Sequence, residues 1–106
     1  MKKQLQDEML KCKTLEEMLN LLKKYYVVTS EVGIIVKTLI ISNLNAQLEK
    51  KLSHEIIEQL KKCNTFGDML AIFSQEYKGV KIEENKKQRI VIGLSTIVTM
   101  TRLKLK

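Results

Sequence analysis

The sequence repeats itself at a spacing of 51 residues, and this repeat restricts the possible folds more than any other feature. Residues 10–26 read LKCKTLEEMLNLLKKYY, and residues 61–77 read KKCNTFGDMLAIFSQEY. A cysteine, a threonine, a Met-Leu pair and a tyrosine recur at equivalent places: Cys12/Cys63, Thr14/Thr65, Met18/Met69, Leu19/Leu70 and Tyr26/Tyr77. We therefore expect two copies of one unit, residues 2–51 and 53–106, within a single domain of residues 1–106.

Each copy is predicted to form two helices joined by a short turn, followed by a longer third helix. Thr14 begins a capping box, because its hydroxyl can accept a hydrogen bond from the amide of Glu17. Apolar residues then follow with the period of an α-helix, and Ile56 and Leu60 repeat Leu5 and Met9 of the first helix. The expected helices are 2–11, 14–26, 30–49, 53–62, 65–78 and 84–103. The fold class is thus an all-α, compact bundle of about six helices, built as two pseudo-symmetric repeats.

The third segment of each copy combines features of a helix and a strand. β-Branched residues are frequent in 27–41, but the length of the segment without a turn signal favours a helix capped by Ser30. Residues 90–103 contain Gly93, which costs about 1 kcal/mol relative to Ala in a helix but can permit close helix packing. A strand over 90–103 remains an alternative. Gly79 is expected to end the fifth helix in the left-handed conformation, and residues 80–87 to form a mobile loop.

The overall composition is that of an ordinary globular protein, with 44% hydrophobic and 29% charged residues. Two cysteines do not make a disulfide framework, so we expect reduced thiols and a cytoplasmic location. The first residues lack the apolar stretch of a signal peptide. The longest uncharged run, residues 90–101, is too short to span a bilayer, and no membrane partner is expected.

The residues able to support catalysis or metal binding are few. Cys12 and Cys63 each precede a predicted helix, where the helix dipole lowers a thiol pKa, so they could form a redox pair or ligate a metal. The favoured interpretation is that both are small apolar residues at interhelical turns. His54 is the one histidine, and no residue spacing indicates a catalytic triad or a phosphate-binding loop. We expect no catalytic residue, metal site or cofactor, and an enzyme ranks third among the functional hypotheses.

Positive charge is concentrated at the end of the chain. The net charge is +7, and residues 86–106 hold six basic residues and no acidic ones. These are the candidate nucleic-acid contacts: Lys86, Lys87, Arg89, Arg102, Lys104 and Lys106. On one helix the two clusters would lie roughly 20–25 Å apart and could reach phosphates across a groove. With few aromatic and arginine residues, such binding would be weak and independent of sequence, and a merely solubilising charge is the alternative.

The leading functional hypothesis is a small non-enzymatic interaction module, either a protein–protein adaptor or a homodimer. It rests on the absence of chemical motifs and on the third and sixth helices, whose apolar faces we expect to exceed what one small bundle can cover. Tyr25 has no counterpart in the second copy, unlike Tyr26. The candidate interface residues are Tyr25, Ile34, Ile41, Ile92 and Val98. Weak binding of nucleic acid through the basic residues is the alternative function.

Overall fold

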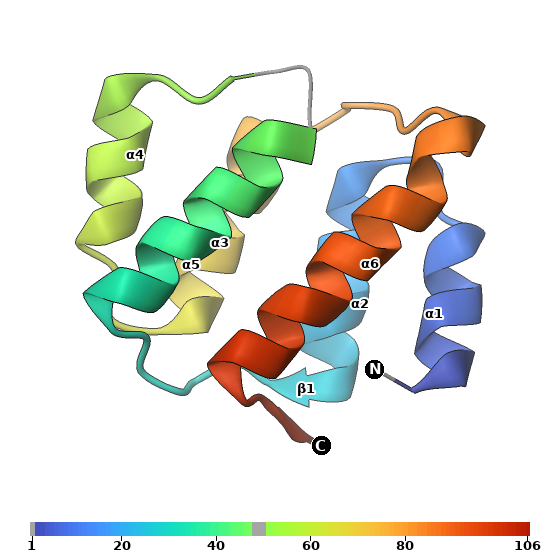
Figure 1. The fold of residues 1–106 in the computed structure, drawn as a ribbon, viewed down its shortest axis with the longest axis horizontal. Helices are drawn as coiled ribbons and strands as arrows, with labels where there is room; N and C mark the ends of the chain where they lie inside the picture. The colour runs from blue at the N-terminus through green and yellow to red at the C-terminus, as the bar shows by residue number, and fades with distance from the viewer. Residues whose placement is uncertain (1, 48–50) are drawn as a thin grey trace.

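Six helices and one short strand pair make up the described part of the chain, residues 2–47 and 51–106 of a computed structural model (Figure 1). The helices are α1 (Lys3–Leu10), α2 (Leu15–Tyr25), α3 (Ile34–Gln47), α4 (His54–Lys61), α5 (Phe66–Glu76) and α6 (Glu84–Thr101). Strand β1 (Tyr26–Val27) pairs antiparallel with β2 (Lys104–Leu105). The predicted all-α class is confirmed.

The helix starts follow the capping residues seen in the sequence. The Thr14 hydroxyl accepts from the Glu17 amide at 3.3 Å, and the Thr65 hydroxyl accepts from the Asp68 amide at 3.1 Å. Ser53 caps α4 in the same way, through the amide of Ile56 at 3.3 Å. Each cap satisfies an amide that lacks a partner within its helix. As a result α4 and α5 begin and end 51 residues after α1 and α2.

The two predicted copies are interleaved, because each long helix packs on the other copy. Helix α3 lies against α4 and α6, while α6 lies against α1 and α3 (Figure 1). The segments leading into the long helices are exchanged as well. The amide of Val32 donates to the carbonyl of Asn64 at 3.0 Å, and that of Ile82 donates to the carbonyl of Lys13 at 2.9 Å. These matched contacts support a pseudo-twofold relation of the halves, which stays a prediction.

This exchange explains why α3 starts later than predicted. Residues 30–32 were expected to be helical, with Ser30 as the cap. Instead the Ser30 carbonyl accepts from the amide of Phe66 at 3.1 Å, and Glu31 forms a bridge with Thr65. Pairing with the start of α5 holds this segment extended, so the helix begins at Ile34. The predicted end of the helix at residue 49 lies outside the described residues.

The second copy resolves the helix-or-strand alternative. Residues 90–101 are helical, and only Lys104–Leu105 of the last segment form a strand. The hydroxyls of Thr96, Thr99 and Thr101 donate to carbonyls four residues earlier, so these side chains are satisfied within the helix. Of the loop expected at 80–87, only residues 80–83 lie outside a helix, because α6 begins at residue 84, and the amide of Ile82 is bonded to the carbonyl of Lys13.

The left-handed conformation predicted for Gly79 is confirmed, although α5 already ends at Glu76 with Tyr77 as its C-cap. Gly79 has a φ of 77°, the left-handed conformation that glycine adopts without strain. Gly93 is buried on α6, and a methyl group placed on it would clash with the side-chain amide of Gln47 on α3. The absence of a side chain at residue 93 therefore leaves room for the Gln47 side chain against α6.

The apolar stripes of α2 and α5 meet in the interior. Leu15, Met18, Leu19 and Leu22 are buried on α2, and the equivalent residues of α5 are buried as well. The Phe73 and Tyr77 rings stack with centroids 6.2 Å apart. The radius of gyration of 12.7 Å is that of a compact chain of this length.

Candidate interaction surfaces

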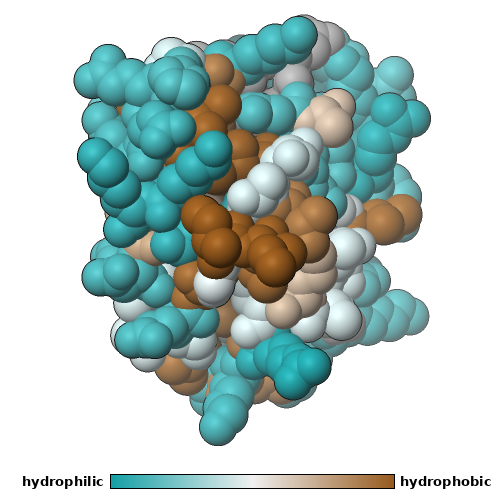
Figure 2. All heavy atoms as spheres, turned by 60° about the vertical axis from the view of Figure 1, so that its left-hand side comes forward, coloured by the Kyte–Doolittle hydropathy of each residue, from teal (hydrophilic) through white to brown (hydrophobic). Residues whose placement is uncertain are grey.

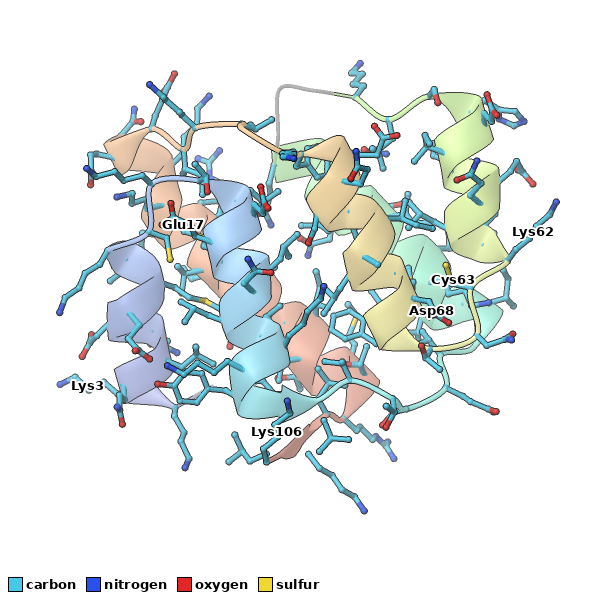
Figure 3. All side chains as sticks on the ribbon, turned by 180° about the vertical axis from the view of Figure 1, so that it is seen from behind. Lys3, Glu17, Lys62, Cys63, Asp68 and Lys106 are labelled. Carbon is cyan, nitrogen blue, oxygen red and sulfur yellow. The ribbon has the colours of Figure 1, made fainter. Side chains whose placement is uncertain are left out.

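The two cysteines occupy matching turns and are not activated. Each thiol donates to the carbonyl four residues earlier, at 3.5 Å: Cys12 to Glu8, and Cys63 to Gln59. Burial raises the pKa of both thiols, and the carboxylate at the start of the next helix adds to this effect, Glu17 for Cys12 and Asp68 for Cys63 (Figure 3). A raised pKa lowers the fraction of thiolate, the form that acts as a nucleophile, so it disfavours a nucleophilic role.

Two buried lysines join the halves of the molecule. Lys37 donates to the carbonyl of Lys61 at 2.9 Å, and Lys87 donates to the carbonyl of Leu10 at 3.3 Å. Lys87 also forms an ion pair with Glu84 at 2.7 Å. Both ammonium groups thus lie at the C-terminal end of a short helix, where the helix dipole favours a positive charge. The exposed fraction of Lys87 is only 4%, so this predicted nucleic-acid contact is part of the interior.

The other predicted basic contacts divide between the two ends of α6. Lys86 forms an ion pair with Glu83 at 3.8 Å, and Arg89 is exposed near the start of the helix. Arg102 and the two lysines of the last segment lie beyond its other end. An 18-residue helix is about 27 Å long, so the two clusters do not form one surface.

The second cluster belongs to a larger basic surface. Strand pairing places Lys104 opposite Val27, and the amide of Lys106 donates to the carbonyl of Tyr25 at 3.0 Å. The last segment therefore lies beside the end of α2, and both termini are at this end of the molecule (Figures 1 and 3). We name the basic residues here the basic end: Lys2, Lys3, Lys23, Lys24, Arg102, Lys104 and Lys106. The first four were not predicted from the sequence, because no residue pattern shows that the start of α1, the end of α2 and the last segment lie at the same end of the molecule.

Helix α3 carries an exposed apolar surface. Ile34 is 57% exposed, Ile35 75% and Leu39 48%. The one charged residue of α3, Lys37, is buried, so the outward side of this helix has no charge. We name its exposed residues the α3 face: Ile34, Ile35, Thr38, Leu39, Ser42 and Ala46. Figure 2 shows hydrophobic side chains gathered among hydrophilic ones on this side of the molecule.

The corresponding side of α6 is mostly polar. Contacts of the long helices match at a spacing of 50 residues, as the buried Lys37 and Lys87 show. At this spacing the three apolar residues of the α3 face correspond to exposed polar ones in α6: Ile34 to Glu84, Ile35 to Asn85, and Leu39 to Arg89. Exposed Ile92 of α6 corresponds to Ser42 of the α3 face. The cluster of three exposed aliphatic residues is therefore a property of α3, whereas α6 exposes a single isoleucine.

The five predicted interface residues differ in how far their side chains are exposed. Ile34 and Ile92 are exposed, as an interface requires. Ile41 and Val98 are buried in the core, because the wide apolar faces of α3 and α6 each cover more than one neighbouring helix. Tyr25 is half-buried, and its hydroxyl donates to the carboxylate of Glu8, which raises the pKa of Tyr25.

Comparison with protein-family models, curated proteins and solved structures finds no match to this chain. The interpretation of its surfaces therefore rests on their chemistry. Within residues 2–47 and 51–106, no helix combines the length and apolar character needed to cross a membrane.

Two open hollows lie between the paired short helices. One of about 260 Å³ is lined by Ile56, Gln59, Ala71, Ile72, Gln75 and Glu76. The other, of about 410 Å³, is lined by Glu8, Lys11, Cys12, Glu17 and Leu21. The second lining holds the Cys12 thiol beside the carboxylates of Glu8 and Glu17, but this thiol donates to the backbone carbonyl of Glu8. In the part of the chain that the structure describes, no three His, Cys, Asp or Glu residues are grouped as metal ligands.

Proposed function

We propose that this protein is a small non-enzymatic interaction module and that the α3 face is its contact surface. The observation that supports this most is the exposure of Ile34, Ile35 and Leu39 on one helix face. Their exposed area is on the order of 300 Å², which is comparable to the largest apolar patch of a typical monomer. Removing such a side chain from water contributes about 1.5–3 kcal/mol when its burial is complete.

The fold itself does not require an apolar residue at these positions. Glu84, Asn85 and Arg89 occupy the matching positions of α6, and that helix packs in the same bundle. Polar residues would also lower the risk of aggregation. The aliphatic residues of α3 are best explained by contact with a partner.

We propose a second copy of this chain as that partner, with α3 packed on α3 about a twofold axis. The net charge of +7 opposes association. The α3 face is uncharged, however, so packing two copies through it brings no like charges into contact. Packing α3 on α6 of the partner would instead bury Glu84 and Arg89 against aliphatic side chains, at a high desolvation cost. The α3–α3 arrangement is self-complementary, as a twofold interface requires.

The dimer should be weak. Helix α3 has 14 residues and is about 21 Å long, so one pair of such faces falls below the area of a standard stable interface. We expect dissociation in the micromolar to millimolar range, where association depends on protein concentration.

The decisive variant gives α3 the outward residues of α6: Ile34→Glu, Ile35→Asn and Leu39→Arg. This triple substitution leaves the net charge unchanged. Sedimentation equilibrium from about 10 µM to about 1 mM should show a dimer for the natural chain and a monomer for the variant. A control with Asn85→Asp, Gln88→Lys and Arg89→Lys changes exposed residues of α6, keeps the net charge and leaves the Lys87–Glu84 ion pair in place, and it should still dimerise. Equal dimerisation of all three proteins would contradict the α3 face as the interface.

A natural chain that stays monomeric at the highest concentration would overturn the second copy as the partner. The proposal that the α3 face is a contact surface is tested separately from the identity of the partner, by selecting displayed helical peptides that bind the natural chain. Selected peptides that lose binding to the α3 triple variant would support the contact surface. Peptides that bind both proteins equally would contradict it.

The non-enzymatic part of the proposal is supported by the thiols of Cys12 and Cys63, whose pKa is raised by burial. Both cysteines are free, which fits a reducing compartment, and we propose the cytoplasm as the place of action.

A further inference from the structure

The basic end brings together positive charges from four parts of the chain: the N-terminal residues, the end of α2, the end of α6 and the β2 segment. Six of its seven basic residues are exposed, and Lys23 is half-buried. Among the described residues, the ion pairs lie elsewhere, on α4 and at the start of α6. We propose that the basic end binds the phosphate backbone of double-stranded nucleic acid, independently of the α3 face.

The backbone holds this arrangement in place. Arg102 ends α6 in the left-handed conformation, with a φ of 52°, and the amide of Leu103 donates back to the carbonyl of Val98 at 3.4 Å. The chain then turns across the end of α2 and pairs with β1. The backbone of Lys104 and Lys106 is thereby held beside the end of α2, which carries Lys23 and Lys24, instead of on a free tail.

The residue types favour phosphate over bases. Six of the seven are lysines, which act as point charges toward phosphate, whereas reading of base edges favours arginine and amide side chains. Single strands are bound mainly by stacking of bases on aromatic rings. Tyr25 is the aromatic residue next to Lys24, whose ammonium lies 5.6 Å from the ring centroid, and the Tyr25 hydroxyl is bonded to Glu8. This ring is therefore poorly placed to stack on a base.

An anionic membrane would offer phosphate as well, but the apolar surface here is small. Val27 and Leu105 are the exposed large apolar residues of the strand pair. Two such side chains do not make the broad apolar face that inserts between lipids. The other predicted basic cluster adds little, because Lys87 is buried and Lys86 is paired with Glu83.

The test compares two triple variants that each remove three positive charges. The basic-end variant is Lys24→Gln, Lys104→Gln and Lys106→Gln. The control is Lys62→Gln, Lys81→Gln and Arg89→Gln, at exposed positions away from the basic end; Figure 3 shows Lys62 far from Lys106. Binding to a fluorescent 20-base-pair duplex is measured by anisotropy at about 20 mM and about 150 mM salt, and thermal unfolding checks that each variant is folded.

The natural chain should bind with micromolar affinity at low salt and lose affinity steeply at the higher salt. The basic-end variant should bind at least tenfold more weakly, with a salt slope lower by up to about 3, whereas the control should stay within about threefold of the natural chain. Equal loss in both variants would overturn the proposal, since net charge alone would then explain binding.

Three further outcomes would overturn the proposal. The first is no duplex binding at low salt, and the second is tighter binding of a single strand than of the duplex. The third is binding to phosphatidylserine vesicles without binding to the duplex, which would assign the surface to lipid. The α3 triple variant should bind the duplex like the natural chain. The proposal of a dimer through the α3 face and the proposal of duplex binding by the basic end can therefore fail independently of each other.

Discussion

The ammonium of Lys87 lies 3.3 Å from the carbonyl oxygen of Leu10, across the boundary between the two halves of the molecule. Lys37 makes the matching contact with the carbonyl of Lys61 at 2.9 Å. In both cases a lysine of a long helix satisfies the end of a short helix that belongs to the other half. These two contacts are therefore sensitive probes of the interleaved packing.

Replacing Lys87 by Met should lower the free energy of unfolding by about 1–3 kcal/mol. Met retains much of the apolar stem, but the Leu10 carbonyl at the helix end loses its charged donor in a buried place. Urea unfolding gives the free energy, and Lys86→Met at the neighbouring half-buried position should change it by less than about 0.5 kcal/mol. Equal effects of the two substitutions would show that the buried contact contributes nothing.

Thr65→Ala should destabilise the protein by about 1 kcal/mol, because the amide of Asp68 loses its capping partner. Ser30→Ala should change stability by less than about 0.5 kcal/mol, since the Ser30 carbonyl, and not its side chain, bonds to Phe66. The two unfolding curves test where α3 begins. A loss of about 1 kcal/mol in Ser30→Ala would favour the earlier helix start expected from the sequence.

Gly93→Ala should show strong coupling to Gln47. Alanine gains up to about 1 kcal/mol in helix propensity, but its methyl group would clash with the side-chain amide of Gln47. We expect Gly93→Ala to be neutral or destabilising in the natural chain and stabilising after Gln47→Ala. A double-mutant cycle measured by thermal unfolding gives the coupling energy, and additivity within about 0.3 kcal/mol would argue against the close helix contact.

Tyr77→Phe should raise stability at neutral pH and reduce the loss of stability in alkali. Burial raises the pKa of Tyr77 to about 12, and no partner for its buried hydroxyl is present among the described residues. The pKa of Tyr77 is higher in the folded protein than the ordinary value near 10, so the unfolded chain loses this proton first. Ionisation of Tyr77 therefore has no effect on the free energy of unfolding below pH 10, and it lowers that free energy as the pH rises toward 12. The natural chain should lose up to about 2 kcal/mol over this range relative to the variant. Parallel stability curves of the two proteins would contradict this assignment.

Much of the local structure could be predicted from the residues. The starts of α2, α4 and α5 follow from Thr14, Ser53 and Thr65, because a capping hydroxyl acts on an amide three residues away. The buried stripes of α2 and α5 follow from their 3.6-residue period, and the turn at Gly79 follows from its missing side chain.

The surfaces could be predicted less well. Lys86 and Lys87 are neighbours with the same chemistry, yet one is half-buried and paired with Glu83 while the other is in the interior. Ile34 and Ile41 are both isoleucines of one helix, yet only Ile34 is exposed. The wide apolar face of α3 indicates more than one neighbouring helix, but it does not reveal which side is left without one.

The sequence by itself determined the six helices, their caps and the match between the short helices at a spacing of 51 residues, because these depend on contacts within a few residues. The tertiary structure decided the exchange of the long helices, the late start of α3 and the burial of Lys87. It also decided the gathering of the basic end around the β1–β2 pair. These features depend on contacts between residues some 35 to about 80 positions apart, which no local pattern of residue types encodes.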